Sequence, residues 1–369
     1  MSPLPLPEIT PHTQAAPKAA RARRIAVVLF NLGGPDRLEA VRPFLYNLFR
    51  DPAIIGLPAP FRQLVAHLIS SRRDKVAQGI YQTLGGGSPL LPNTQAQAQA
   101  LEQQLWDAGT VRVFVSMRYW HPFSDAVAHD VKDWEPDEVV LLPLYPQFST
   151  TTTASSLKDW QRAAKAAGLT APSRSICCYP DEPGFVAATA KLIRAGLEEA
   201  APHGKPRVLF SAHGLPEKVV KGGDPYQFQC ERTAQAVVKS LRIEKLDWVS
   251  CYQSRVGPMK WIGPSTDEEI RRAGQDRVPV VVVPIAFVSE HSETLVEIEH
   301  EYRHLAREVG VPHFVRVPAV GVEPSFILGL AGLVRQALIR AAGGPVMCGT
   351  GLRLCPAGKA GCPQPASGA

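Results

Sequence analysis

Two short stretches of the sequence hold side chains that can bind a metal ion or move a proton. His213 lies three residues beyond the apolar run 207–210, and the acidic stretch that begins at Ser289 follows the apolar run 280–287. If both runs are parallel strands, His213 and Glu293 lie just beyond the carboxyl ends of those strands, where open α/β sheets place their ligands. The two stretches therefore predict one site shared between two strand ends.

The acidic stretch has the spacing of a helix with carboxylates along one face. These carboxylates belong to Glu290, Glu293, Glu297 and Glu301, and at about 100° per residue they fall on one stripe. A solvated acidic face would show the same spacing. However, this row starts at a strand end, and a lone histidine lies at a second strand end. Carboxylate and imidazole both accept divalent cations, so the row predicts a path for a metal ion or for protons.

The composition is that of a folded protein without a nucleic-acid signature. The 369 residues are 45% hydrophobic and 20% charged, which is typical of globular domains and allows two of them. A net charge of +6 suits a substrate with carboxylates or an anionic membrane surface. There is no dense basic block with interleaved aromatic residues, so we expect no nucleic-acid partner. No run of 18 apolar residues and no secretory signal are found, and we expect a cytoplasmic protein.

Apolar runs and turns follow the same order in both parts of the chain. The runs 25–30, 111–116 and 139–145 are echoed by 207–210, 247–252 and 280–287. Strands that alternate with helices indicate βαβ units and parallel sheets. We therefore predict an α/β fold with two Rossmann-like, parallel-sheet halves related by pseudo-twofold symmetry, and a cleft between them.

The same pattern predicts where these parts begin and end. We expect a disordered leader over residues 1–24, a first half over 25–172 and a second half over 173–324. A helix over 325–342 should pack back on the first half, and a cysteine-containing tail should cover 343–369. One further segment is apolar and broken by prolines, and it leads into an amphipathic helix with Leu64 and Leu68. That segment predicts either peripheral contact with a membrane, a cover over a ligand, or ordinary core packing.

From about Ile25 to Arg340 the chain resembles the ferrochelatases, lyases that insert ferrous iron into a porphyrin at the end of haem synthesis. The motifs that carry the resemblance are 31–35 (NLGGP), 85–89 (GGGSP), 117–122 (MRYWHP), 211–216 (SAHGLP), 253–264 (QSRVGPMKWIGP) and 289–297 (SEHSETLVE). The family fold has two Rossmann-like halves around a porphyrin cleft. The resemblance implies Fe²⁺ and protoporphyrin IX as substrates, protohaem and two protons as products, and a monomer or homodimer.

The resemblance also implies roles for single residues. His213 matches a histidine on one face of the macrocycle that acts as proton acceptor, metal ligand or both, and Glu293 matches the carboxylate facing it. An acidic conduit for metal or protons, often on a π-distorted helix, would include Glu290, His291, Glu297 and Glu301. Cleft-lining positions are matched by Leu32, Arg118, Tyr119 and Trp261, and a basic pair near the porphyrin propionates by Arg72 and Arg73. Since other members carry Met or Tyr where Leu32 stands, only packing is expected of Leu32.

Three of the seven cysteines, Cys348, Cys355 and Cys362, lie in a Gly/Pro-rich tail that has no core to join. Such thiolates bind zinc or an iron–sulfur centre, and either needs a fourth ligand. The resemblance implies a 2Fe–2S cluster with three ligands in a C-terminal extension and one from earlier in the chain. Thr150 stands where the animal members carry that earlier ligand. We therefore expect Cys178 (or Cys177) to be the fourth ligand, with zinc or free thiols as alternatives.

Other functions fit part of the same pattern. A chelatase of this fold could act on coproporphyrin or insert cobalt. A non-catalytic tetrapyrrole or metal carrier could use the same apolar walls and arginines, but it would not need both His213 and Glu293. The presence of this pair favours the enzyme.

Overall fold

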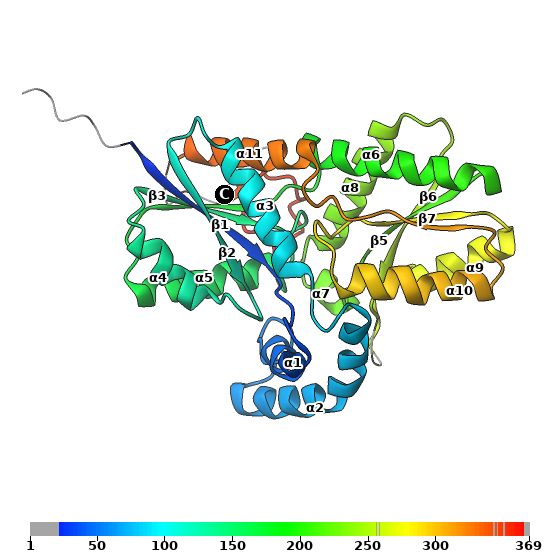
Figure 1. Cartoon of the computed structure of the whole chain (residues 1–369), viewed down its shortest axis with the longest axis horizontal. Helices are drawn as coiled ribbons and strands as arrows, with labels where there is room; N and C mark the ends of the chain where they lie inside the picture. Colours follow the sequence, from blue (N-terminus) through cyan, green and yellow to red (C-terminus); the bar gives the residue numbers. More distant parts are fainter. Residues whose placement is uncertain are drawn as a thin grey trace, which may run out of the picture.

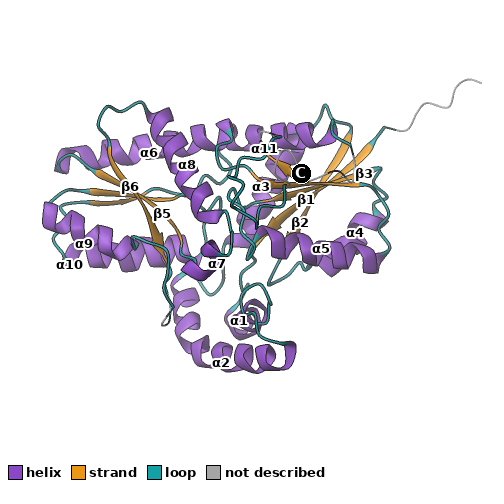
Figure 2. Ribbon diagram, turned by 180° about the vertical axis from the view of Figure 1, so that it is seen from behind, coloured by secondary structure: helices purple, strands orange, loops and turns teal. Residues whose placement is uncertain are grey.

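The computed structural model describes residues 22–364, apart from 256, 258, 342, 343, 345 and 350. The predicted leader therefore lies almost wholly outside the described residues, as does the end of the tail from residue 365. Two parallel sheets lie side by side, each covered by helices on both faces (Figures 1 and 2). The predicted α/β architecture of two parallel-sheet halves is confirmed.

The first sheet has five parallel strands in the order β2-β1-β3-β4-β9. They are β1 (Arg24–Asn31), β2 (Thr110–Met117), β3 (Glu138–Pro143), β4 (Ser173–Cys178) and β9 (Met347–Cys348). One face is covered by α3 (Leu90–Gln104) and α11 (Pro324–Leu338), and the other by α4 (Ser124–Asp133) and α5 (Thr153–Ala167). Residues Ile25 to Leu29 of the inner strand β1 are fully buried. Burial on both faces explains why this strand is continuously apolar rather than alternating.

The second sheet repeats the plan with four parallel strands in the order β6-β5-β7-β8. They are β5 (Arg207–His213), β6 (Asp247–Gln253), β7 (Val280–Pro284) and β8 (Phe314–Arg316). One face is covered by α6 (Pro183–Ala200) and α8 (Tyr226–Leu241). The other is covered by α9 (Thr266–Asp276), the π-helix η3 (Glu293–Tyr302) and α10 (Arg303–Glu308). The short α7 (Glu217–Lys221) follows β5, and the 3-10 turns are η1 (Leu38–Ala40) and η2 (Ala201–His203).

Strand ends and the boundary between halves differ from the sequence prediction. The third predicted strand of each half stops early, at Pro143 and at Pro284, because proline has no N–H to donate to a ladder. The predicted boundary at residue 172 is too early for the sheets, since β4 pairs with β3 in the first sheet. The sequence analysis did not identify β4 or β8 as strands. Both are short, and β4 is less continuously apolar than the central strands.

Helices α6 and α11 join the two halves on one side of the molecule (Figure 1). Phe185 at the start of α6 packs with Phe326 of α11 in the core beneath the first sheet, whereas Ile193 further along α6 belongs to the core of the second sheet. The helix predicted over 325–342 is observed as α11, and its apolar face lies on the first sheet. One continuous layer of helices therefore spans both sheets and holds them together.

On the opposite side, the helices α1 (Val41–Phe49) and α2 (Ala59–Thr83) project away from both sheets (Figures 1 and 2). Phe61, Leu64 and Leu68 of α2 are 64%, 59% and 45% exposed. Ordinary core packing, one of the predictions for this segment, is therefore wrong for these three residues. None of the described helices is both long and apolar enough to cross a membrane.

Candidate active site and cysteine centre

His213 is the last residue of β5, and Glu293 is the first residue of the π-helix that follows β7. Because β5 and β7 are neighbours in the sheet, the two side chains meet at its carboxyl edge. Nδ1 of His213 lies 2.9 Å from Oε2 of Glu293. The predicted facing arrangement of His213 and Glu293 is thus a direct side-chain contact in this structure, with no space for another molecule between the two atoms.

This contact fixes how each group holds its proton. Burial opposes the charge on both side chains, but their mutual attraction and hydrogen bond outweigh it. The pKa of Glu293 falls to about 2, and the pKa of His213 rises above its usual value. Since an ionised carboxylate can only accept, the neutral imidazole carries its proton on Nδ1 and donates it to Glu293. Its Nε2 lone pair is then available to accept a proton or bind a metal ion.

His291 and Glu297 complete the inner part of the site. Nε2 of the buried His291 lies 3.9 Å from the same Glu293 oxygen, and burial lowers the pKa of His291 so that it is neutral. Glu297 accepts from the backbone N–H of Ser254 (2.7 Å), the Ser254 hydroxyl (2.5 Å) and the Gln253 amide (3.0 Å). All of these donors are uncharged. Burial, together with the charge of Glu293, raises the pKa of Glu297.

The outer carboxylates do not continue this group as the helical stripe predicted. Glu290 accepts from the Arg316 guanidinium at 2.8 Å and from the backbone N–H of Ala319 at 3.0 Å, so its charge is already paired. Glu301 is exposed at the far end of the π-helix. The segment Glu293–Tyr302 is also a π-helix with i→i+5 turns, so its carboxylates do not follow the α-helical spacing assumed in the prediction. Arg316 comes from β8, so no local signal revealed its pairing with Glu290.

A second buried carboxylate, which the sequence analysis missed, organises the first half. Oδ2 of Asp51 accepts from the Arg118 guanidinium (2.7 Å), the Tyr119 hydroxyl (2.8 Å) and the Ser155 hydroxyl (2.5 Å). Its Oδ1 accepts from the backbone N–H of Ala53 at 2.8 Å. Asp51 is 4% exposed. Arg118 and Tyr119, predicted to line the cleft, are thus both bound to a protein carboxylate.

The other predicted substrate residues lie around this site but do not form one cluster. Trp261 lies against Gly214, the residue after His213, because residue 216 bridges to it and a Cβ on Gly214 would touch its ring at 3.3 Å. Its indole Nε1 is buried without a hydrogen-bond partner among the described residues. Leu32 packs with Tyr119 in a small core. Arg72 and Arg73 are exposed on α2, with Arg73 over the Phe49 ring.

The tail brings its cysteines to the end of β4. Strand β9 pairs with β4, and Cys348 lies opposite Cys178. The Sγ atom of Cys178 is 3.3 Å from that of Cys348 and 3.2 Å from that of Cys177. Cys355 lies near them, since the Gln229 amide contacts both its sulfur and that of Cys178, and Cys362 shares a hydrogen bond with Cys355. All seven cysteines are buried and free.

Two of these thiols have lowered pKa values, whereas the neighbouring sulfurs and burial raise the pKa values of Cys177, Cys178 and Cys355. Hydrogen bonds from Cys177 and Cys178 lower the pKa of Cys348 to about 3, and the contact with Cys355 lowers that of Cys362 to about 6. The loop between Cys348 and Cys362 is held by Arg353, which donates to the carbonyls of Cys355, Pro356, Lys359 and Gln364. A preformed pocket of buried sulfurs fits the tetrathiolate ligation of an iron–sulfur cluster or zinc.

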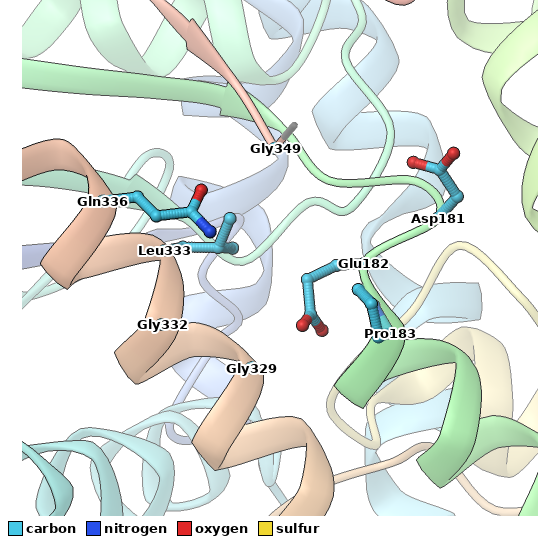
Figure 3. Close-up of a pocket in the computed structure, with 8 residues that line it drawn as sticks. All are labelled: Asp181, Glu182, Pro183, Gly329, Gly332, Leu333, Gln336 and Gly349. Carbon is cyan, nitrogen blue, oxygen red and sulfur yellow. The ribbon is translucent and has the colours of Figure 1, made fainter. Parts of the chain in front are cut away.

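One cavity lies near the cysteines but outside both sites. It has a volume of about 80 Å³ and is lined by Asp181, Glu182, Pro183, Gly329, Gly332, Leu333, Gln336 and Gly349, between the start of α6 and α11 (Figure 3). Glu182 accepts from the backbone N–H of Phe185 at 2.7 Å and so caps α6. Since Glu182 already serves the helix N-terminus, this cavity is explained as a packing gap.

Comparison with known proteins agrees with this geometry. A family model described as ferrochelatase matches residues 24–338. The chain is 56% identical over 324 residues to the ferrochelatase of Caulobacter vibrioides, covering 87% of this chain and 92% of that protein. It is 52% identical over 310 residues to the ferrochelatase of Wolbachia pipientis wMel, covering 84% and 98%. The three tail cysteines lie beyond the residues matched by the family model.

Among solved structures, SirB from Bacillus subtilis with Fe³⁺ has a TM-score of 0.52 and covers 86% of this chain and 96% of its own at 11% identity. The sirohydrochlorin chelatase SirB from Bacillus subtilis subspecies spizizenii, in complex with cobalt, has a TM-score of 0.50 at 12% identity and covers 85% and 95%. At such identities the likeness shows the fold alone, which is the two-sheet arrangement described above.

Proposed function

The chain belongs to the ferrochelatase family, lyases that insert iron into a porphyrin, and we propose that His213 is the base of this reaction and protoporphyrin IX its substrate. The observation that carries the proposal is the contact between Nδ1 of His213 and Glu293. In the neutral imidazole this contact holds the proton on Nδ1, so the lone pair is on Nε2. A neutral imidazole near pH 7 is suited to accept a pyrrole proton.

Insertion replaces two pyrrole N–H protons by one Fe²⁺, so two protons must leave. We propose that Nε2 of His213 takes the first proton and that Glu293 stabilises the resulting imidazolium. Glu297, whose pKa is raised, is suited to hold a proton on its way out. Gln253 connects the two carboxylate positions, because its amide contacts the Glu293 carbonyl at 3.5 Å and Glu297 at 3.0 Å. The same residues would also lead Fe²⁺ inward. Glu301 would bind the ion at the entry, and His291 would bind it at the inner end.

The ring would be held by the apolar side chains near the two strand ends. Trp261 lies against Gly214, the residue after His213, and Leu32 packs in the other half. A site that bends the macrocycle exposes the nitrogen lone pairs and so binds the transition state better than the flat substrate. Arg72 and Arg73 remain exposed cations on α2 that suit the propionates. This arrangement supports a substrate that enters between α2 and the sheets.

Anaerobic Fe²⁺ insertion into protoporphyrin IX, followed by absorbance, tests the proposal. We expect haem formation by the wild type, and loss of insertion with retained porphyrin binding in His213→Ala. Turnover by His213→Ala at the wild-type rate would remove the histidine from the mechanism. Faster metallation of coproporphyrin, or of protoporphyrin by Co²⁺, would identify a different chelatase. Binding without any metallation would identify a carrier.

We further propose that the tail binds a 2Fe–2S cluster through Cys348, Cys355, Cys362 and Cys178. Cys178 is favoured over Cys177 because its sulfur lies between that of Cys348 and the Gln229 amide, which also reaches Cys355. When bound, such a cluster supplies a one-electron redox group. Cys178→Ser should abolish the visible iron–sulfur spectrum, whereas Cys177→Ser should keep it. If only Cys177→Ser abolishes the spectrum, Cys177 is the fourth ligand instead of Cys178. Protein that contains zinc and shows no visible iron–sulfur spectrum would identify a zinc site instead of a cluster.

We also propose a cytoplasmic protein whose α2 face touches a membrane surface. The support is the exposed apolar group Phe61, Leu64 and Leu68 beside the cations Arg72 and Arg73. Co-sedimentation with anionic vesicles should fall in Phe61→Ser and should not change in Trp106→Ser, a change at an exposed residue beyond α3. Equal sedimentation of both variants would rule out this face. Light scattering would distinguish the monomer from the homodimer.

A further inference from the structure

Gln229 of α8 is a fully buried glutamine that lies between the backbone and two cysteines. Its Oε1 lies 2.7 Å from the backbone nitrogen of Phe148. Its Nε2 lies 3.1 Å from Sγ of Cys355 and 3.5 Å from Sγ of Cys178. These two cysteines are far apart in sequence, one in the tail and one at the end of β4. The side chain therefore connects both ligand-bearing segments of the cysteine centre.

The orientation of this amide follows from its surroundings. A backbone N–H can only donate, so the Gln229 atom that faces Phe148 must be the carbonyl oxygen. The NH₂ group is consequently directed at the sulfurs. The neighbouring Thr233 hydroxyl, one turn along α8, donates to the backbone carbonyl of Gln229 at 2.9 Å and accepts from the Gln147 amide at the same distance, so it does not compete for the Gln229 side chain. Both N–H donors are thus held toward the sulfurs before any ligand binds.

We infer that Gln229 is a positioning residue that raises the reduction potential of the tail cluster by donating hydrogen bonds to Cys178 and Cys355. This inference rests on the cluster proposed above. One-electron reduction adds negative charge to the cluster and its thiolates. An N–H directed at those sulfurs stabilises the reduced form more than the oxidised form, and hydrogen bonds to the sulfurs are a recognised control of potential.

Gln229→Met tests the inference, with Gln227→Met as its matched control. Methionine has the length of glutamine and a weak acceptor sulfur but no donor. Gln227 lies on the same helix and contacts Glu231 instead of the sulfurs. The cluster is titrated potentiometrically, with dithionite supplying one electron per cluster, and the reduced form is measured by electron paramagnetic resonance. At a fixed potential, Gln229→Met should lower the ratio of reduced to oxidised cluster about tenfold, which is 59 mV for one electron.

Unchanged potentials in Gln229→Met, with the cluster intact, would overturn the inference while leaving the cluster in place. A wild type without an iron–sulfur spectrum would instead overturn the cluster itself. If Gln229→Met loses the cluster, the wild type supplies the test. Protein labelled with ¹⁵N at the glutamine side-chain amides should show a nitrogen coupling to the reduced cluster in pulsed electron paramagnetic resonance. The absence of that coupling would overturn the inference.

Discussion

Both halves place a carboxylate beside the end of their second strand, Asp51 buried and Glu297 partly buried, and the two carboxylates have opposite surroundings. In the first half, Asp51 binds Arg118 just beyond β2, and the negative charge meets a guanidinium. In the second half, Glu297 binds Gln253 and Ser254 at the end of β6, and all its partners are neutral. The carboxylate that meets the end of the second strand is therefore a paired charge in one half and an unpaired charge in the other.

This difference separates a structural carboxylate from one that can take part in chemistry. The charge of Asp51 is compensated by the Arg118 guanidinium 2.7 Å away. The negative charge of Glu297 has only neutral donors around it and is not compensated, and the pKa of Glu297 is raised. A proton or a divalent cation can compensate such a charge. The comparison implies that the reaction is concentrated in the second half and that the first half supplies a rigid wall.

Removing the structural carboxylate should have the largest effect on folding. Asp51→Ala leaves the Arg118 guanidinium, 19% exposed, without its nearest charge partner. Loss of one member of a buried pair is expected to lower the free energy of unfolding by about 3 kcal/mol. Urea denaturation measures this. Asp125→Ala, which breaks the exposed pair with Arg162, should cost less than about 1 kcal/mol. Equal urea midpoints for Asp51→Ala and Asp125→Ala would contradict a structural role for Asp51.

Removing the unpaired charge should instead affect turnover. Glu297→Gln keeps the size of the side chain and an acceptor for the Ser254 N–H, so we expect the free energy of unfolding to change by less than about 1 kcal/mol. Loss of the proton or metal site should lower kcat on the order of 100-fold. Steady-state insertion kinetics and urea denaturation on the same samples check both statements. A Glu297→Gln enzyme that is unstable but fully active would reverse the comparison.

The sequence was sufficient to predict three strands of each sheet and the strand ends at which His213 and Glu293 lie, because each depends on contiguous residues. A continuous apolar run predicts a buried parallel strand, and His213 and Glu293 lie at or beyond the ends of two such runs. The turn after His213 and the helix that contains Glu293 are formed by residues adjacent to them in the sequence. The direct contact between the two side chains was not predicted, since it depends on β5 and β7 being neighbours.

The residues that sequence reasoning missed act over long separations in the chain. Asp51 meets Arg118 from the loop between α1 and α2, and Arg316 reaches Glu290 from β8. Neither partner belongs to a local motif, so spacing carries no signal of the pairing. Gln229 is similar, because a glutamine inside an amphipathic helix has no feature that indicates sulfur contacts. Contacts between residues far apart in the chain could therefore be identified only from the three-dimensional structure.

The ion pair of the second half should show a particular dependence on pH. The pKa of His213 is raised above 6.5, so its stabilising charge is fully present below pH 6.5 and is lost as the pH rises through the folded value. The pKa of Glu293 is lowered from 4.5 to about 2, so its contribution is present above pH 4.5 and is lost as the pH falls. The pair should therefore stabilise the fold most between about pH 4.5 and 6.5.

Glu293→Gln removes the attraction that raises the His213 pKa and leaves burial, which lowers it. The His213 pKa should fall, and the acid side of the residual kcat/KM profile should move to lower pH. Nuclear magnetic resonance titration of the ten histidines, with His213 assigned by His213→Ala, measures the pKa directly. A His213 pKa that stays the same or rises would show that Glu293 does not control the base.

The smallest effect is expected at the outer end of the π-helix. Glu301 is exposed, so Glu301→Gln removes a solvated charge and leaves the buried contacts of Glu293 and Glu297 intact. We expect an unchanged kcat and at most a twofold rise in the KM for Fe²⁺, since exposed charges act mainly by attracting ions and are screened by salt. Raising the ionic strength should abolish even that difference. A loss of kcat comparable to that of Glu297→Gln would instead place Glu301 within the reaction path and extend the unpaired acidic site to the surface.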